Sequence, residues 1–231
     1  MKKRKKIAPL VPRDTFIPII IALVWNMLVY NGTKIIMRNS YHYKIGFEFE
    51  EAIPFLPWTV TIYLGCYIFW VVNYIIGCRQ DRKEAFQFIS ADFFAKTICL
   101  LFFLLFPTTN IRPEVADANV FDWFMQLVYR MDTPENLFPS IHCLTSWFCF
   151  IVVRKNKAIP KWYRVLSLIF TFLICISTLT TKQHVLIDVF AGLLLAEGSY
   201  FLVRVTGFAT AYEKISTKCG DKIYRLIKKE T

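Results

Sequence analysis

Residues 58–76 read WTVTIYLGCYIFWVVNYII, a run that contains no Asp, Glu, Lys or Arg. A helix needs roughly 20 apolar residues to cross the hydrocarbon layer of a membrane, so this run predicts a transmembrane helix. Five further runs are also predominantly apolar, although some of them contain charged residues: Phe16–Tyr30, Phe88–Phe106, Ser140–Val153, Trp162–Thr180 and Val185–Val205. We therefore predict an all-α fold, a polytopic membrane helix bundle of six transmembrane helices.

The composition of the whole chain agrees with a membrane protein. Of its 231 residues, 55% are hydrophobic and 17% are aromatic, and the mean hydropathy is +0.41. A soluble domain of this length would bury one core and keep a polar surface. The net charge of +11 could indicate a nucleic-acid partner. The charges, however, lie between the apolar runs rather than on one amphipathic surface, so no nucleic-acid partner is expected.

The distribution of Lys and Arg predicts the orientation of the helices. With the N-terminus inside, the inner segments hold 21 of these residues and the outer segments hold six. Because cytoplasmic segments are enriched in Lys and Arg, we expect both termini to lie in the cytoplasm. We also expect the protein to lie in the cell (plasma) membrane. The basic segment Met1–Lys6 could open a signal peptide, but no small-residue cleavage site follows it, so an uncleaved first helix is expected. Residues 1–231 are expected to form one membrane-embedded domain.

Polar residues gather in three segments at the ends of predicted helices: Pro107–Glu114, Asp132–His142 and Thr180–Asp188. Under the predicted orientation, all three lie at the extracytoplasmic face. Between the first two, Val120–Tyr129 is amphipathic and aromatic. This segment predicts either a helix lying in the membrane interface or a lid packed on the outer ends of the bundle.

His184 and Asp188 are four residues apart at the start of a predicted helix, which places them on one face. A carboxylate in this position can hold one imidazole nitrogen and direct the other nitrogen at a substrate. The alternative is a polar pair that only satisfies its own hydrogen bonds at a helix end.

Ser140 begins another predicted helix, where it suits the N-cap position. In that geometry the free N–H groups of Ile141 and His142 point outward and can bind an anion. His142 could then protonate the leaving oxygen of a bound phosphate. Capping alone is the simpler interpretation of Ser140.

Two basic residues lie near these segments. The guanidinium of Arg112 could donate two hydrogen bonds to phosphate oxygens, or could only extend to the headgroup region as an ordinary boundary arginine. Lys182 could add a second positive charge beside His184, or be an ordinary loop lysine. Within the apolar runs, Asp92 and Lys96 are four residues apart and could form an intramembrane pair. We expect this pair to contribute to helix packing.

Taken together, these segments resemble the type 2 phosphatidic acid phosphatase superfamily. The motifs of that family are Lys-x6-Arg-Pro, Pro-Ser-Gly-His and Ser-Arg-x5-His-x3-Asp. The matches are Arg112–Pro113, Pro139–Ser140–Ile141–His142, and Ser177 with His184 and Asp188, within a region of about residues 105–188.

Three positions depart from the family pattern. Leu105 stands in place of the first Lys, Ile141 in place of the Gly, and Thr178 in place of the Arg. Two phosphate-binding cations are therefore absent, and Lys182 is a candidate replacement for one. These departures look more like the branch that contains inositol phosphorylceramide synthases and sphingomyelin synthases, which transfer a phosphate headgroup between lipids.

The resemblance implies a mechanism in which His184 attacks phosphorus, Asp188 orients it and His142 protonates the leaving group. Arg112, Lys182 and Ser140 would hold the phosphate oxygens of a lipid substrate. The resemblance implies no metal and no cofactor, and the seven cysteines form no CxxC or Cys/His ligand pattern that would suggest zinc.

Three functions remain open at this point. The first is an integral membrane phosphatase acting on a lipid phosphate monoester or pyrophosphate, of phosphatidate or isoprenyl type. The second is a lipid phosphotransferase that uses a lipid alcohol in place of water. The third is a non-catalytic transporter or scaffold, which the two absent cations would favour and the retained histidines oppose.

Overall fold

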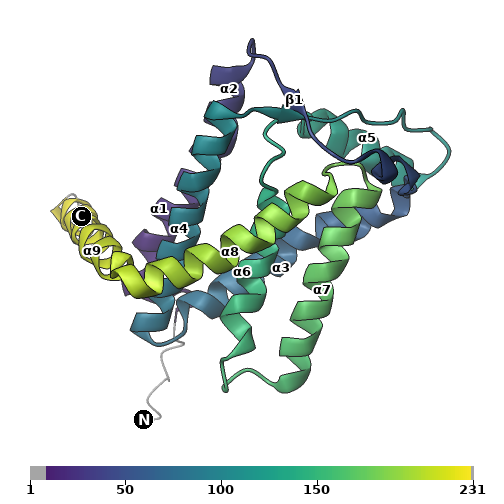
Figure 1. The fold of residues 1–231 in the computed structure, drawn as a ribbon. Coiled ribbons are helices and arrows are strands. Elements are labelled where there is room, and N and C mark those ends of the chain that lie inside the picture. Colours follow the sequence, from purple (N-terminus) through teal and green to yellow (C-terminus); the bar gives the residue numbers. More distant parts are fainter. Residues whose placement is uncertain (1–8, 230–231) are drawn as a thin grey trace.

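A computed structural model describes residues 9–229, so the basic segment Met1–Lys6 lies outside the described residues. Within them, five helical stretches are long and apolar enough to cross a membrane. They are Arg13–Met37, Pro57–Cys78, Arg82–Leu105, Lys161–Thr180 and Leu186–Thr206. The predicted fourth span corresponds to a shorter apolar helix, α6 (Ile141–Arg154). Figure 1 shows the resulting bundle.

The first helical stretch is longer than the predicted Phe16–Tyr30. It consists of α1 (Arg13–Met27), a π-helical turn (Leu28–Gly32) and α2 (Thr33–Met37). The added residues at its C-terminal end include Asn31, Gly32 and Lys34, and tertiary contacts support this part of the helix. Lys34 forms an ion pair with Asp132 at 3.0 Å and lies over the ring of Tyr30.

Helices α3 (Val60–Cys78) and α4 (Arg82–Leu105) form a hairpin. A short turn joins them, in which the Asp81 carboxylate caps α4 by accepting from the N–H of Glu84 at 3.2 Å. Buried phenylalanines along α4 pack against α3 and α6, and α4 lies at the centre of the bundle. Large aromatic side chains therefore fill the interior, as expected where helices are buried on several sides.

Helix α6 meets α8 (Leu186–Thr206) at very short range. A Cβ atom placed on Gly192 of α8 would lie 2.6 Å from the backbone oxygen of Ser140 and 3.2 Å from the nitrogen of Leu144. Only glycine permits this approach. It brings the N-terminal turn of α6 beside the first turns of α8, where the second and third sequence motifs lie.

The connections at this end of the bundle form a cover. Strands β1 (Tyr43–Lys44) and β2 (Thr108–Thr109) pair in parallel. The predicted amphipathic helix is α5 (Val120–Met131). It buries Met125 and Val128 against the start of α3 and leaves Trp123 exposed. One face of α5 thus packs on the bundle, as a lid would, and the other face exposes apolar side chains, as a helix in the membrane interface would.

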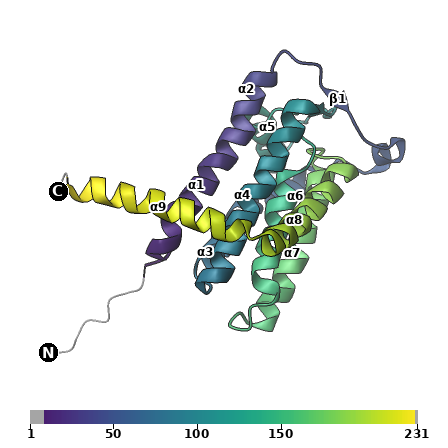
Figure 2. The ribbon, with the colours of Figure 1, turned by 60° about the vertical axis from the view of Figure 1, so that its left-hand side comes forward.

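A C-terminal helix, α9 (Phe208–Lys229), was not predicted. Figures 1 and 2 show it crossing α1 and α4 at the opposite end of the bundle. The hydroxyl of Tyr212 donates to the carbonyl of Pro18 at 2.8 Å, and Gly220 lies against Ile17. Basic side chains interrupt the apolar residues of this segment, which is why it does not resemble a membrane span in the sequence.

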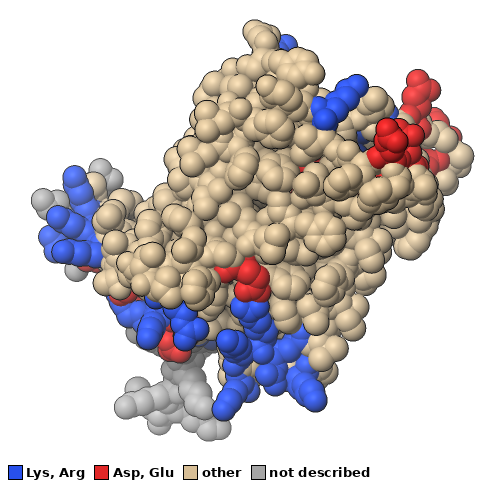
Figure 3. Space-filling model, viewed as in Figure 1, with Lys and Arg blue, Asp and Glu red and all other residues tan. Residues whose placement is uncertain are grey.

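Charged side chains separate along the bundle. Figure 3 shows Lys and Arg gathered at the end that carries α9 and the turns after α3 and α6. A patch of acidic side chains lies at the other end, beyond the band of apolar surface, with a few basic side chains beside it, and other acidic side chains lie among the basic ones. This is the separation that the count of Lys and Arg in the sequence predicted.

The close approach at Gly192 can be tested by replacing Gly192 with Ala. The new Cβ would meet backbone atoms that cannot rotate away, and overpacking of this kind destabilises by about 1–3 kcal/mol. We expect Gly192→Ala to lower the Tm of the detergent-solubilised protein by several degrees. The matched control is Gly198→Ala in the same helix, where the added Cβ meets no described atom within 4 Å. Equal Tm values for the two variants would contradict this packing.

Candidate functional site

His184 lies in the tight turn between α7 (Lys161–Thr180) and α8. The backbone N–H groups of Gln183 and His184 both donate to the carbonyl of Thr178, at 2.9 and 3.1 Å. Nδ1 of His184 lies 3.2 Å from Oδ2 of Asp188, and the same carboxylate oxygen accepts from the N–H of Val185. Asp188 thus fixes the ring and leaves Nε2 of His184 for other contacts, as the spacing predicted.

The environment of His184 sets its protonation. Burial alone would lower the pKa of the imidazole, because the charged form loses water. The hydrogen bond to Asp188 and the negative charge of that carboxylate outweigh this effect, so the pKa of His184 is raised above its ordinary value. The ring therefore becomes neutral, and able to act as a nucleophile, only at a pH above that raised pKa.

His142 lies in the first turn of α6, and its ring centroid is 5.8 Å from that of His184. One backbone hydrogen bond joins α6 to α8 here, and one side-chain hydrogen bond caps the start of α6. The N–H of Ser140 donates to the carbonyl of Asp188 at 3.1 Å, and the Ser140 hydroxyl accepts from the N–H of Cys143 at 3.3 Å. Ser140 is therefore the N-cap that the sequence predicted, and the two histidines face one another across the junction.

Sequence reasoning missed two residues that hold His142. Its Nε2 lies 2.9 Å from the hydroxyl of Tyr63, which donates to Oδ2 of Asp132 at 3.3 Å. Asp132 also accepts from Tyr30 and Lys34. Tyr63 lies within an apolar run, where nothing in the sequence distinguishes it from the other tyrosines. Asp132 lies within the polar segment Asp132–His142, which the sequence analysis identified.

The charge state of Asp132 follows from its neighbours. Burial would raise the pKa of this carboxyl, but the electrostatic interactions with His142 and Lys34 and the hydrogen bonds from Tyr30 and Lys34 lower it below the usual value. Asp132 is thus an anion at neutral pH. Through Tyr63 it forms a continuous hydrogen-bonded chain with His142.

Arg112 reaches the same site from the segment after β2. Its guanidinium donates to the backbone carbonyl of Asp132 and to Oε1 of Gln183, and it lies 4.7 Å from the centre of the Tyr129 ring. Burial lowers the pKa of Arg112 below its ordinary value. Its buried Nε has no hydrogen-bond partner among residues 9–229. Arg112 is thus fixed beside His184 with a donor to spare.

Lys182 takes a different direction from the other predicted residues. It adopts a positive φ of 52°, and its ammonium donates to the carbonyl of Glu50 at 3.3 Å. Lys182 and Glu48 both line a cavity of about 320 Å³, and His184 lines the same cavity. Within the described residues, then, five predicted site residues converge and Lys182 lines an adjoining cavity.

A family model described as the PAP2 superfamily matches residues 49–202. The chain belongs to the PAP2 superfamily. The match spans α3 to most of α8 and thus every site residue described above. A search of curated proteins gave no match.

As a PAP2 superfamily protein with five apolar helices, the chain is a membrane enzyme of the phosphatase type. Its departures from the family motifs are visible in the structure. Leu105 is 80% exposed on the outside of α4, and the Thr178 hydroxyl donates to the carbonyl of Cys175 at 2.7 Å. Neither position brings a cation to the site, whereas the Arg112 guanidinium contacts Gln183 in the turn that holds His184.

The effect of Asp188 on His184 can be measured without any substrate. The chain has three histidines, so selective ¹⁵N labelling of His gives few NMR signals, and a His184→Ala sample assigns one of them. We expect His184 to titrate above the ordinary pKa of about 6.5. In Asp188→Asn the carboxylate is absent and burial prevails, so the pKa should fall. An unchanged titration in Asp188→Asn would show that Asp188 does not act on His184.

Proposed function

We propose that this PAP2 protein hydrolyses a lipid phosphate monoester or pyrophosphate through a phosphohistidine on His184. The observation that carries the proposal is the pair of histidine rings 5.8 Å apart, one held by Asp188 and the other by Tyr63. One ring can attack phosphorus while the other serves the leaving group on the opposite side.

The reaction takes two steps. Nε2 of neutral His184 forms a bond to phosphorus as the bond from phosphorus to the lipid oxygen breaks, and His142 gives that oxygen a proton. The lipid alcohol, or lipid monophosphate from a pyrophosphate, then leaves. Water attacks the phosphohistidine, His142 takes a proton from it, the P–N bond breaks and inorganic phosphate is released.

Positive charge and free N–H groups would stabilise the phosphate oxygens. Arg112 has an unpaired buried Nε, and buried donors without an acceptor are rare in proteins. The N-terminal turn of α6 adds N–H groups with no partner inside the helix. Ser140 and Lys182 complete the proposed set, with Lys182 acting from the adjoining cavity. We propose no metal and no cofactor for these steps.

The proposal includes a topology. Six helices would span the cell membrane, with both termini in the cytoplasm, and the site would open on the extracytoplasmic side. The distribution of basic side chains supports this arrangement. Lys and Arg gather at the end of the bundle away from the His142–His184 pair, and cytoplasmic ends of membrane proteins carry such an excess.

A lipid phosphotransferase is the second candidate, in which the hydroxyl of a lipid alcohol replaces water in the second step. The observation that favours it is the absence of a cation at both Leu105 and Thr178, which the sequence shares with the transferase branch. Both reactions use the same phosphohistidine, so the acceptor alone distinguishes them.

The central prediction concerns phosphate release by the purified protein in detergent with EDTA present. We expect release from phosphatidate or from a short isoprenyl phosphate. His184→Ala should reduce it to background, and His142→Ala should slow it by about 10²–10⁴-fold, the usual contribution of a general acid. His42→Ala is the matched control, because His42 is only half-buried and, among the described residues, its Nδ1 contacts the carbonyl of Ser40 and no site residue.

The acceptor is tested by adding diacylglycerol or another lipid alcohol to the same reaction. A new His184-dependent phospholipid without phosphate release would identify the transferase. Neither product with any of these lipids, together with a correctly folded protein, would contradict both enzymatic candidates and favour a non-catalytic function.

Tyr63 is expected to act as a positioning residue. Tyr63→Phe keeps the ring that packs near Met125 but removes the hydroxyl between His142 and Asp132. We expect kcat to fall about 10- to 100-fold, the range seen when a partner of a functional histidine is removed. KM and Tm should change little, and the pH–rate profile should shift. Tyr163→Phe is the control, since it removes a hydroxyl that contacts Asn73 elsewhere in the bundle. A normal pH–rate profile in Tyr63→Phe would exclude the positioning function.

A further inference from the structure

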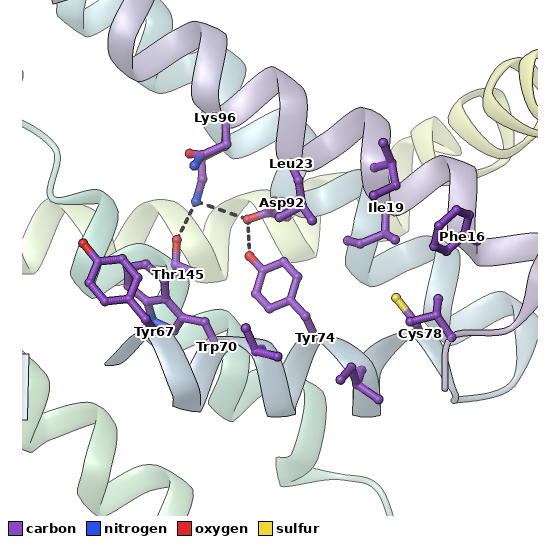
Figure 4. A pocket seen from close by; sticks show the side chains of 15 residues that line it. Phe16, Ile19, Leu23, Tyr67, Trp70, Tyr74, Cys78, Asp92, Lys96 and Thr145 are labelled. Atoms are coloured by element: carbon purple, nitrogen blue, oxygen red, sulfur yellow. Dashed lines mark hydrogen bonds and ion pairs between the residues drawn. The ribbon is translucent and has the colours of Figure 1, made fainter. Parts of the chain in front are cut away.

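A second cavity of about 330 Å³ lies between α1 and α3 (Figure 4). Its walls are almost entirely apolar. Residues at helical spacing line it from Tyr67 to Cys78 on α3 and from Phe16 to Asn26 on α1. Leu23 and Val71 on its rim are 43% and 61% exposed, on a surface that would face lipid. The length of α3 along the cavity is about 16 Å at 1.5 Å per residue.

One end of this cavity is walled by aromatic residues that lie beside His142. The rings of Trp70 and Tyr67, which both line the cavity, lie 5.5 and 6.4 Å from the ring of His142. Trp70 is fixed by a hydrogen bond from its Nε1 to the hydroxyl of Ser146. A lipid whose phosphate lies at His142 and His184 would therefore find an apolar channel directly below it.

The inner wall of the cavity carries a polar cluster formed by Asp92, Lys96, Thr145 and Tyr74. Figure 4 shows the Lys96 ammonium directed at Thr145 and Asp92, at 2.6 and 3.2 Å, and the hydroxyl of Tyr74 at 2.8 Å from Asp92. All four side chains are buried, so this cluster places polar and charged groups inside predicted membrane spans.

The cluster retains unused hydrogen-bonding capacity. An ammonium has three donors, and among residues 9–229 that of Lys96 contacts two acceptors, Thr145 and Asp92. Oδ1 of Asn26, which also lines the cavity, is buried and has no partner among the same residues. Packing alone would not need a charged pair here, because apolar residues of similar volume serve as well in buried positions. Ionisable groups inside a membrane bundle commonly mark a ligand path.

The depth of the cluster suits one part of a lipid. Thr145 follows His142 by one helical turn of α6, so its hydroxyl lies about 4.5 Å deeper along the helix axis. In a lipid phosphate built on a glycerol or sphingoid backbone, the first groups below the phosphate that accept hydrogen bonds are ester or amide carbonyls. An isoprenyl phosphate has only hydrocarbon at that depth.

We propose that the Lys96–Asp92–Thr145 cluster binds the ester or amide carbonyl of an acylated lipid phosphate, with the adjacent acyl chain in the cavity between α1 and α3. This inference rests on the proposed function, since it takes the phosphate to lie at His142 and His184. It assigns the substrate to acylated lipid phosphates and not to isoprenyl phosphates.

The test is a binding measurement that needs no turnover. Native mass spectrometry of the His184→Ala protein would compare a diacyl phosphatidate with its dialkyl ether analogue, which lacks both carbonyls. We expect the ester lipid to bind about 3- to 10-fold more tightly, as one net hydrogen bond would give. Ceramide 1-phosphate separates the amide from the ester source, because tighter binding than the ether lipid would extend the site to amides.

The variant that removes the preference is Asp92→Asn with Lys96→Met, which replaces the ion pair without leaving a lone charge. Ester and ether lipids should then bind equally. Thr145→Val serves as a second, milder variant if the double variant does not fold, and it should reduce the preference. Thr97→Val is the matched control, because Thr97 lies on α4 beside Asp92 and Lys96 but its hydroxyl accepts from Trp25 instead.

The two proposals fail in different ways. Equal binding of ester and ether lipids by the His184→Ala protein, or a preference that survives in the double variant, would overturn the carbonyl site while leaving phosphate release unaffected. A preference that holds while the wild-type protein releases no phosphate would refute the proposed hydrolysis and leave the lipid-binding site standing.

Discussion

The contact between the start of α6 and the start of α8 determines the geometry of the site. Gly192 lets the two backbones approach until a Cβ would collide with the oxygen of Ser140, and the N–H of Ser140 then reaches the carbonyl of Asp188. His142 lies two residues from Ser140, and the ring of His184 is hydrogen-bonded to Asp188. A shift of either helix would therefore change the separation of the two histidine rings directly.

The sequence predicted those parts of the molecule that depend on local pattern. Apolar runs identified the long helices, and the spacing of His184 and Asp188 predicted a hydrogen bond that the structure contains. The cap at Ser140 was likewise expected from residue type. The family model confirms the resemblance on which the site residues were assigned. The six-span count and the orientation stay predictions, since one helix is shorter than a typical span.

Contacts between distant segments could not be predicted in the same way. Tyr63 belongs to an apolar run, and only the packing of α3 against α6 makes it a partner of His142. The direction of Lys182 depends on a positive φ and on Glu50. Helix α9 was missed because basic residues interrupt its apolar residues in the sequence. Its apolar face is defined by its packing on α1, where Tyr212 contacts Pro18. In each case a tertiary contact decides a position that local propensity leaves open.

The shortness of α6 has a consequence for how the protein sits in its bilayer. Its 14 residues extend about 21 Å, whereas the hydrocarbon layer is about 30 Å thick. If Arg154 lies at one boundary, the N-terminal turn with His142 lies well inside the other boundary, below the level of the headgroups. The phosphate must then descend to meet the histidines, or the bilayer must thin around this helix. The thickness of the bilayer should therefore affect the depth of the histidine pair, through hydrophobic mismatch at the single helix α6.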